Sequence, residues 1–131
     1  MADHTPAHLP TFVYKLISPA SAFNKDDTVL PLSELDRNDG FYHLSTAAQV
    51  PDTANRYFPG SKFPELLVLK IRYRGIQPLV RWDPVPPNRV FPHVYGDLLQ
   101  EHIDSKIKLS WDPVANSWDF SEGWEDRTEP L

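Results

Sequence analysis

Two of the five histidines stand inside apolar runs and are the first candidates for chemistry. His43 lies in "GFYHLST", which begins at residue 40, and His93 lies in "FPHVYG", which begins at residue 91. An imidazole titrates near neutral pH, so a positioned pair of them suits acid–base catalysis. Two interpretations stay open: each ring is a satisfied core group that donates to a backbone carbonyl, or both rings meet in one polar pocket after folding.

Neighbouring side chains complete a candidate site around the two rings. Asp83 and Glu101 are candidate carboxylates, because an acid beside a histidine assists proton transfer or stabilises an electron-poor sugar carbon. The flat face of Trp82 suits the floor of a site for a planar ligand. We therefore predict catalytic roles for His43, His93, Asp83 and Glu101, and ligand contacts from Ser45, Thr46, Trp82, Tyr95 and Arg56.

Structural roles compete with several of these assignments. Trp82 equally suits a core cap at the end of a strand, and a helix arginine such as Arg56 is normally exposed to solvent rather than bound to a phosphate or carboxylate. Ser45 lacks the Gly-x-Ser-x-Gly turn of a hydrolase nucleophile. The histidines have neither His-x-His nor His-Glu-x-x-His spacing and the chain has no cysteine. We therefore predict no metal site.

The composition narrows the class of protein and of partner. The 131 residues are 40% hydrophobic and 24% charged, as in soluble globular proteins. A net charge of -5 disfavours a surface that binds phosphate backbones, so nucleic acid is not the predicted partner. No apolar run is long enough for a membrane helix, and the start "MADHTPAHLP" lacks the apolar core of a signal peptide. We expect a cytoplasmic protein with a small-molecule ligand.

The hydrophobic periodicity predicts short strands around one main helix. Thr46 and Gln49 form a capping-box pattern before this helix, and its buried stripe includes Tyr57 and Phe58. Fourteen prolines indicate long, rigid connections. Together these elements predict an α+β fold rather than a doubly wound one. The predicted strands are 11–17, 41–44, 67–73, 79–82 and 103–111, the last towards a sheet edge.

The remaining segments are predicted to be turns and tails. Residues 35–40 have the Asn, Asp and Gly of a turn, and residues 18–24 favour one short helical turn. Residues 11–123 form one globular domain in this interpretation. Flexible tails are expected at 1–10 and at 124–131.

Five motifs occur in an order that is typical of a known family. They are "GFYHLSTAAQV", "TANRYF", "LLVLKI", "RWDP" and "FPHVYG". Their order and spacing resemble those of domain-of-unknown-function family 952, whose members are small bacterial, plant and fungal proteins. The resemblance covers about residues 13 to 109, and the ordered set is far more specific than any single motif.

The resemblance implies an ADP-ribosyltransferase-like fold, in which two small sheets surround a cleft that binds NAD in the active enzymes. By the match of its "HLS" segment, His43 would contact a ribose hydroxyl of NAD. Tyr95 is the candidate for the aromatic ring that stacks on nicotinamide. The late-strand glutamate of those transferases has no counterpart in 106–109, and Glu101 precedes that strand. Without this charge, NAD binding could persist while transfer is lost.

Three hypotheses about function follow. The first is a pocket protein that binds NAD or another planar, nucleotide-like molecule and acts as a transferase, or as a lyase or isomerase that uses histidine acid–base chemistry. The second is a noncatalytic ligand-binding or protein-interaction module whose histidines are structural. The third is an RNA 2'-phosphotransferase-like activity, which shares the fold but is disfavoured by the acidic net charge.

Overall fold

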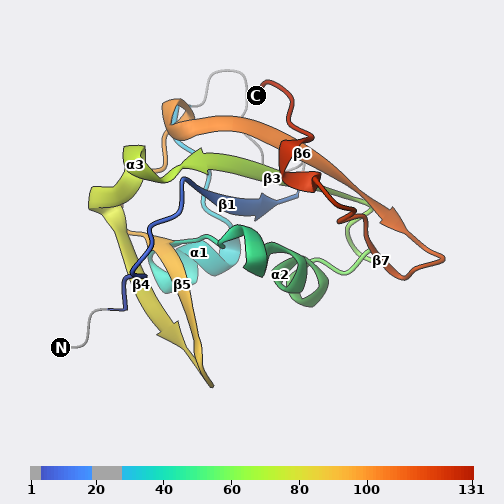
Figure 1. The fold of residues 1–131 in the computed structure, drawn as a ribbon, viewed down its shortest axis with the longest axis horizontal. Helices are drawn as coiled ribbons and strands as arrows, with labels where there is room; N and C mark the ends of the chain where they lie inside the picture. Colours follow the sequence, from blue (N-terminus) through green and yellow to red (C-terminus); the bar gives the residue numbers. More distant parts are fainter. Residues whose placement is uncertain (1–3, 19–27) are drawn as a thin grey trace.

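A four-stranded antiparallel sheet is the larger of two sheets in the computed structural model, which describes residues 4–18 and 28–131 (Figure 1). The central strand β3 buries side chains on both of its faces, because other elements cover both sides of this sheet. Its strands, in spatial order, are β1 (Phe12–Ile17), β3 (Glu65–Arg72), β6 (Ile103–Asp112) and β7 (Ser117–Trp118).

A three-stranded antiparallel sheet supplies the other half of the fold. Its spatial order is β2 (Tyr42–His43), β5 (Arg89–Val94) and β4 (Val80–Val85). The short strand β2 pairs with β5 so that His43 lies directly opposite His93. This pairing joins the two apolar runs that the sequence keeps far apart. The two sheets and a few short helices confirm the predicted α+β fold.

Helix α1 (Glu34–Asp39) replaces the turn predicted at 35–40. The Ser33 hydroxyl accepts a hydrogen bond from the Asp36 backbone N–H at 3.1 Å, and the Asp36 carboxylate accepts one from the Ser33 N–H at 3.4 Å. This reciprocal cap stabilises a first turn. Gly40 ends the helix with a φ of 82°, a left-handed conformation that glycine adopts without strain. The turn-like residues are therefore the end of a short helix.

Helix α2 (Val50–Tyr57) confirms the main predicted helix. It follows a single 3₁₀ turn, η2 (Ala47–Gln49), where the Thr46 backbone N–H donates to the Gln49 side chain at 3.0 Å. The predicted burial of Tyr57 is wrong, because this residue is 58% exposed at the last turn. The remaining helical segments are α3 (Tyr73–Ile76), η3 (Gln77–Leu79), η4 (Gln100–His102) and η5 (Trp124–Asp126).

Two apolar clusters lie on the two faces of the four-stranded sheet. The inner cluster joins Val13, Leu69 and Ile71 of that sheet to the three-stranded sheet. The outer cluster joins the opposite face to α2 and to the C-terminal residues, and Trp118 is its largest fully buried side chain. Alternate residues of β1 and β3 therefore enter different clusters, as the period of a strand requires.

The C-terminal residues are packed against the sheet, which corrects the expectation of a loose tail at 124–131. Trp124 is buried, and its ring lies 5.5 Å from that of Tyr14. Lys106 and Glu129 exchange two backbone hydrogen bonds of 3.0 and 2.9 Å. Strand β6 is consequently covered by β7 and by this bridge instead of standing at an open edge. An aromatic anchor and backbone pairing hold the segment in place.

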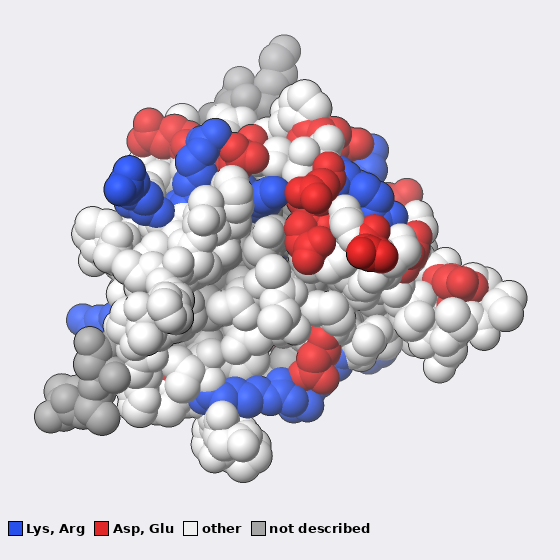
Figure 2. Space-filling view, viewed as in Figure 1, with Lys and Arg blue, Asp and Glu red and all other residues white. Residues whose placement is uncertain are grey.

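Charged side chains are unevenly spread over the surface. Figure 2 shows them gathered along the upper part of one face, over the region where Figure 1 places β3 and β6, while the middle of this face carries few. Within residues 4–18 and 28–131, no helix has the length and apolar character needed to cross a bilayer. Most of the helical turn expected at 18–24 lies outside the described residues.

Candidate functional site

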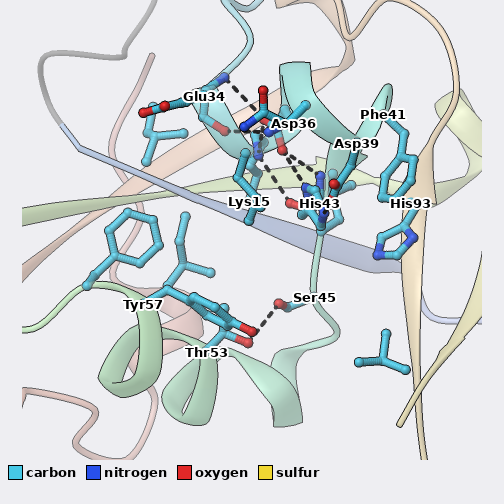
Figure 3. Close-up of a pocket in the computed structure, with 18 of the residues that line it drawn as sticks. Lys15, Glu34, Asp36, Asp39, Phe41, His43, Ser45, Thr53, Tyr57 and His93 are labelled. Carbon is cyan, nitrogen blue, oxygen red and sulfur yellow. Dashed lines mark hydrogen bonds and ion pairs between the residues drawn. The ribbon is translucent and has the colours of Figure 1, made fainter.

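A cleft of about 1090 Å³ opens between helix α1, the middle and end of α2 and the strands that carry the two histidines (Figure 3). Strand β1 contributes Lys15, and α1 contributes three acidic side chains. Strands β4 and β5 contribute Asp83 and His93, with Tyr95 just beyond β5. Elements from both sheets thus supply polar groups to one cavity, as small-molecule sites commonly require.

The two histidines meet at one side of this cleft. Their ring centroids are 5.1 Å apart, with an interplanar angle of 67°. Phe41 stacks on His93 with centroids 4.3 Å apart, and it also contacts the rings of His43 and Tyr95 at 4.7 and 4.9 Å. The β2–β5 pairing fixes this arrangement, because opposed residues in adjacent strands have their side chains on the same face.

His93 is oriented by a carboxylate. Its Nδ1 lies 2.8 Å from Asp83 Oδ2, and the Tyr95 hydroxyl donates to the same oxygen at 2.6 Å. A carboxylate can only accept hydrogen bonds, so Nδ1 of His93 must carry the proton in its contact with Asp83. In the neutral ring this assignment leaves a lone pair on Nε2. Nε2 has no hydrogen-bond partner in the described part of the chain. Every fully buried side-chain N or O atom in that part does have a partner, so Nε2 is not fully buried. Nε2 therefore keeps some accessible surface, on a ring that lines the cleft.

The electrostatics keep this ring in its neutral form. Burial lowers the pKa of His93 below its usual value of 6.5, although the hydrogen bond to Asp83 opposes the shift. Burial raises the pKa of Asp83, but the hydrogen bonds from Tyr95 and His93 outweigh it, so the net pKa is lowered. Burial and the adjacent carboxylate raise the pKa of Tyr95 to about 12. At neutral pH the three groups form a tyrosine–carboxylate–imidazole chain with a basic nitrogen at its end.

His43 belongs to a separate ionic network. Asp36 Oδ1 lies 2.7 Å from His43 Nδ1 and also accepts the His43 backbone N–H at 3.0 Å. Asp39 Oδ2 lies 2.8 Å from His43 Nε2. The other oxygen of Asp36 binds Lys15 Nζ at 2.9 Å, and Nζ donates to the His43 carbonyl at 3.2 Å. Both ring nitrogens of His43 therefore lie within hydrogen-bond distance of a carboxylate.

Two of these charges are almost completely removed from solvent. The side chains of Lys15 and Asp36 are 5% and 1% exposed. Burial lowers the pKa of Lys15, against the attraction of Asp36. Burial raises the pKa of Asp36, but the hydrogen bonds from His43 and the pairing with Lys15 outweigh it and hold the pKa well below its usual range. A buried pair of this kind survives because each charge satisfies the other.

A hydroxyl pair and an apolar end complete the cleft. Ser45 Oγ lies 3.3 Å from Thr53 Oγ1 of α2 (Figure 3). Phe58 and Phe63 line the apolar end with their rings 5.2 Å apart, and the exposed Tyr57 lies at the same end. The cleft therefore has an ionic half and an aromatic half, which together suit a ligand with a flat apolar body and a polar group.

The structure brings together five of the nine residues predicted for the site, namely His43, His93, Asp83, Ser45 and Tyr95. The other four do not line the cleft. Trp82 is buried in the inner cluster and its indole N–H donates to the Tyr73 hydroxyl at 3.1 Å, which corrects its assignment as the floor of the site. Thr46 caps η2, and Glu101 is exposed in η4.

Arg56 also lies away from the cleft lining. Its side chain is 53% exposed and is 3.5 Å from Asp52 on the preceding turn of α2. This pairing is an ordinary surface contact between positions four residues apart. Arg56 is therefore outside the lining of the cleft, and its role in ligand binding stays a prediction.

The sequence interpretation missed the residues that surround His43. Lys15 carried a signal, since it is a single charge in the apolar run "FVYKLI". Asp36 lies three residues after Ser33, the spacing of a helix cap, and Asp39 follows it by three more residues. Their convergence on His43 depends on the contact of α1 with β2 and leaves no local pattern.

No cluster of three or more histidine and carboxylate side chains arranged to hold a metal ion occurs in the described segments 4–18 and 28–131. Their side chains instead bond to one another, as in the Asp36–His43 and Asp83–His93 pairs.

Fold and cleft together define a small α+β protein with a polar cleft between two sheets. The chain belongs to the family described as "Protein of unknown function (DUF952)", whose model matches residues 17–106. The crystal structure of protein CC0527 from Caulobacter crescentus is similar, with a TM-score of 0.75 and 26% identity over 88% of this chain and 99% of that one. The solution structure of CC0527 gives a TM-score of 0.61 at 26% identity, covering 80% and 90% of the two chains. No curated protein matches the chain significantly.

Proposed function

We propose that this protein is an enzyme that binds a planar small molecule in the cleft and acts on it by acid–base catalysis, with His93 as the base. One observation carries the proposal. Asp83 fixes Nδ1 of His93, while Nε2 has no hydrogen-bond partner in the described part of the chain and keeps some accessible surface, on a ring that lines the cleft. A carboxylate that orients an imidazole in this way is a recurring device of general bases.

The proposed step moves one proton. Nε2 takes a proton from an X–H group of the ligand, and the electron pair of that bond stays on the ligand. The imidazolium that forms is stabilised by the Asp83 carboxylate 2.8 Å from Nδ1. Return of the proton at another ligand atom gives an isomerisation, and loss of a leaving group before its return gives an elimination.

The pH dependence of activity tests the role of His93. Because burial lowers the pKa of His93 below 6.5, kcat/KM should rise as the pH increases to about that value and reach a plateau near neutrality.

A thermal-shift screen of NAD, nucleotides and metabolites supplies the substrate, since ligands that bind the native state raise its stability. His93→Ala should abolish turnover of any hit, while His8→Ala, at an exposed position, should not. Full activity of His93→Ala would remove the proposal.

An ADP-ribosyltransferase form of this proposal takes NAD as the ligand, as the resemblance implies. His43 lines the cleft, but Glu101 does not, so another carboxylate must replace the late-strand glutamate. Asp39 of α1 and Asp83 of β4 are the candidates within the cleft. Incubation with NAD should release nicotinamide and His43→Ala should prevent the release. No nicotinamide at high protein concentration rules out this form and leaves the acid–base proposal intact.

A noncatalytic binding module is the second candidate, and the His43 network favours it. Both ring nitrogens of His43 are held by Asp36 and Asp39, which is the pattern of a structural histidine. In this case His43→Ala and His93→Ala lower the free energy of unfolding but leave ligand affinity unchanged. Measuring both quantities on the same two variants separates the candidates.

A further inference from the structure

The charges that line the cleft are unbalanced. Its described lining contains four carboxylates, Glu34, Asp36, Asp39 and Asp83, against one lysine, Lys15, and two histidines. Even with both imidazoles protonated, the carboxylates outnumber the cations by one. A cleft with low-dielectric walls focuses such a field on whatever enters it. The electrostatic potential in the cleft therefore favours a positively charged ligand.

The strongest donors in the cleft are already engaged. Lys15 Nζ binds Asp36 and the His43 carbonyl, and both ring nitrogens of His43 face carboxylates. The Tyr95 hydroxyl donates to Asp83. A phosphate or carboxylate on a ligand would have to displace one of these contacts, and the displaced carboxylate would then lie beside a second anion.

Acceptors, by contrast, remain available. The Glu34 carboxylate has no hydrogen bond or ion pair in the described part of the chain, and Asp39 uses only Oδ2. His93 gives an independent indication, because its side chain is only 7% exposed and yet its Nε2 has no partner and keeps some accessible surface, on a ring that lines the cleft. An accessible lone pair on an otherwise buried ring can accept a hydrogen bond from a ligand that supplies a donor.

Aromatic rings supply the flat surfaces. Phe41 stands at the histidine side of the cleft, and Tyr57, 58% exposed, stands at the apolar end with Phe58 and Phe63. Aromatic faces attract cations and pack well against flat rings. Shape and charge thus select the same kind of molecule.

We propose that the cleft selects a planar organic cation that carries N–H donors, such as an amidine, a guanidine or a protonated amine on a ring, and rejects phosphate-bearing nucleotides. Its donors bind Glu34, Asp39 and His93 Nε2. This inference rests on the proposed function, because it names the substrate class of the same cleft, and it sets the NAD form of that function aside.

Benzamidine, benzamide and benzoate provide a direct test, since they have the same flat shape and carry a positive, a neutral and a negative group. Their dissociation constants are measured by backbone amide chemical shifts at pH 7.5 and low ionic strength, with adenosine monophosphate as a fourth probe. We expect benzamidine to bind about tenfold more tightly than benzamide, because charge-assisted hydrogen bonds are roughly twice as strong as neutral ones. Benzoate and adenosine monophosphate should bind more weakly still. The shifts should centre on Phe41 and His93.

Matched variants identify the residues responsible. Glu34→Gln removes one charge from the cleft without breaking a contact in the described structure, and it should weaken benzamidine about fivefold while leaving benzamide unchanged. Glu122→Gln is the control, because it makes the same change at an exposed position that does not line the cleft. A loss of structure would weaken both ligands equally.

Several outcomes overturn the inference. They are tighter binding of benzoate or adenosine monophosphate than of benzamidine, equal binding of all three benzene derivatives, and no binding of benzamidine at about 10 mM. The two proposals fail separately. Selective benzamidine binding without any His93-dependent turnover removes the proposed catalysis and keeps the cation site. His93-dependent turnover of an anionic substrate keeps the proposed catalysis and removes the cation site.

Discussion

The outer apolar cluster and the cleft are built on opposite principles. The outer cluster packs α2, Trp118 and Trp124 on the four-stranded sheet without a buried charge among its members. The cleft, in contrast, holds four of the five buried polar or charged residues in the described part of the chain, namely Lys15, Asp36, Ser45 and His93. Burial of charge is costly, and an apolar replacement is often as stable. Its concentration at one cavity therefore indicates a requirement of that cavity rather than of folding.

The two regions also differ in how their groups are satisfied. Side chains of the outer cluster gain stability from the apolar area that they bury, which requires no particular charged partner. In the cleft each buried charge depends on a partner, as Asp36 does on Lys15 and His43. We therefore expect single substitutions to act locally in the cluster and to propagate through the network in the cleft.

The Asp36→Asn variant gives the largest expected effect. It keeps the shape and the capping oxygen but leaves Lys15 buried without a counter-charge, and breaking a buried pair typically costs about 3–5 kcal/mol. Urea denaturation measures the loss in the free energy of unfolding. Asp104→Asn is the matched control, because the ion pair of Asp104 with Arg72 is exposed on the arginine side and is worth less than about 1 kcal/mol.

A second substitution shows whether the loss comes from the lysine charge. Lys15→Met combined with Asp36→Asn should recover most of the lost stability, since the unpaired charge is then absent. If the double variant is no more stable than Asp36→Asn, the hydrogen bonds that His43 donates to Asp36 carry the stability instead.

Ile107→Ala probes the outer cluster. Ile107 is fully buried opposite Val68, and removing its branched side chain should lower the free energy of unfolding by about 2–5 kcal/mol through lost burial and a residual cavity. Ligand affinity in the cleft should not change. Val114→Ala, at a position 95% exposed, is the control and should have almost no effect. A parallel loss of affinity would mean that the cluster and the cleft are coupled.

Acid should distinguish the two regions. The pKa of Asp36 in the folded protein lies below its usual value of 3.8, so its contribution to stability is present above that pH and is lost as the pH falls further. The lowered pKa of His93 adds a decline that begins below pH 6.5. Thermal denaturation from pH 7 to pH 3 should therefore show a steep loss in the wild type and in Ile107→Ala. The slope below pH 4 should be smaller in Asp36→Asn, and an unchanged slope would contradict this role of Asp36.

The sequence predicted the elements that depend on local pattern. Strands β1, β3, β4 and β6 and helix α2 follow from alternation and from three- and four-residue periodicity. Helix α1 was missed because its Asn, Asp and Gly also suit a turn, and the Ser33–Asp36 cap that decides between them lies at its start. The tail at Trp124 was missed because burial of an aromatic near a terminus depends on a distant surface.

The site was predictable only in part, for the same reason. The two histidines stood out as polar residues in apolar runs, and the β2–β5 pairing brings them together. The predicted roles of Trp82 and Glu101 rest on residue type alone, because no periodicity indicates which way their side chains turn. Lys15, Asp36 and Asp39 come from different elements, so their network depends on the packing of α1 over the sheets, which the sequence pattern does not specify.

We expect the smallest effect on stability from Tyr95→Phe. This variant separates the control of the His93 pKa from the contribution of the cleft to folding. The variant loses one hydrogen bond to Asp83, which is worth about 1 kcal/mol. Without that donor, more of the carboxylate charge acts on His93, so the pKa of His93 should rise toward its usual value of 6.5. Titration of the imidazole ring protons by NMR measures the shift, and Tyr57→Phe, which alters an exposed ring elsewhere in the cleft, provides the control. An unchanged His93 titration would show that the Tyr95 hydroxyl has no influence on the basicity of Nε2.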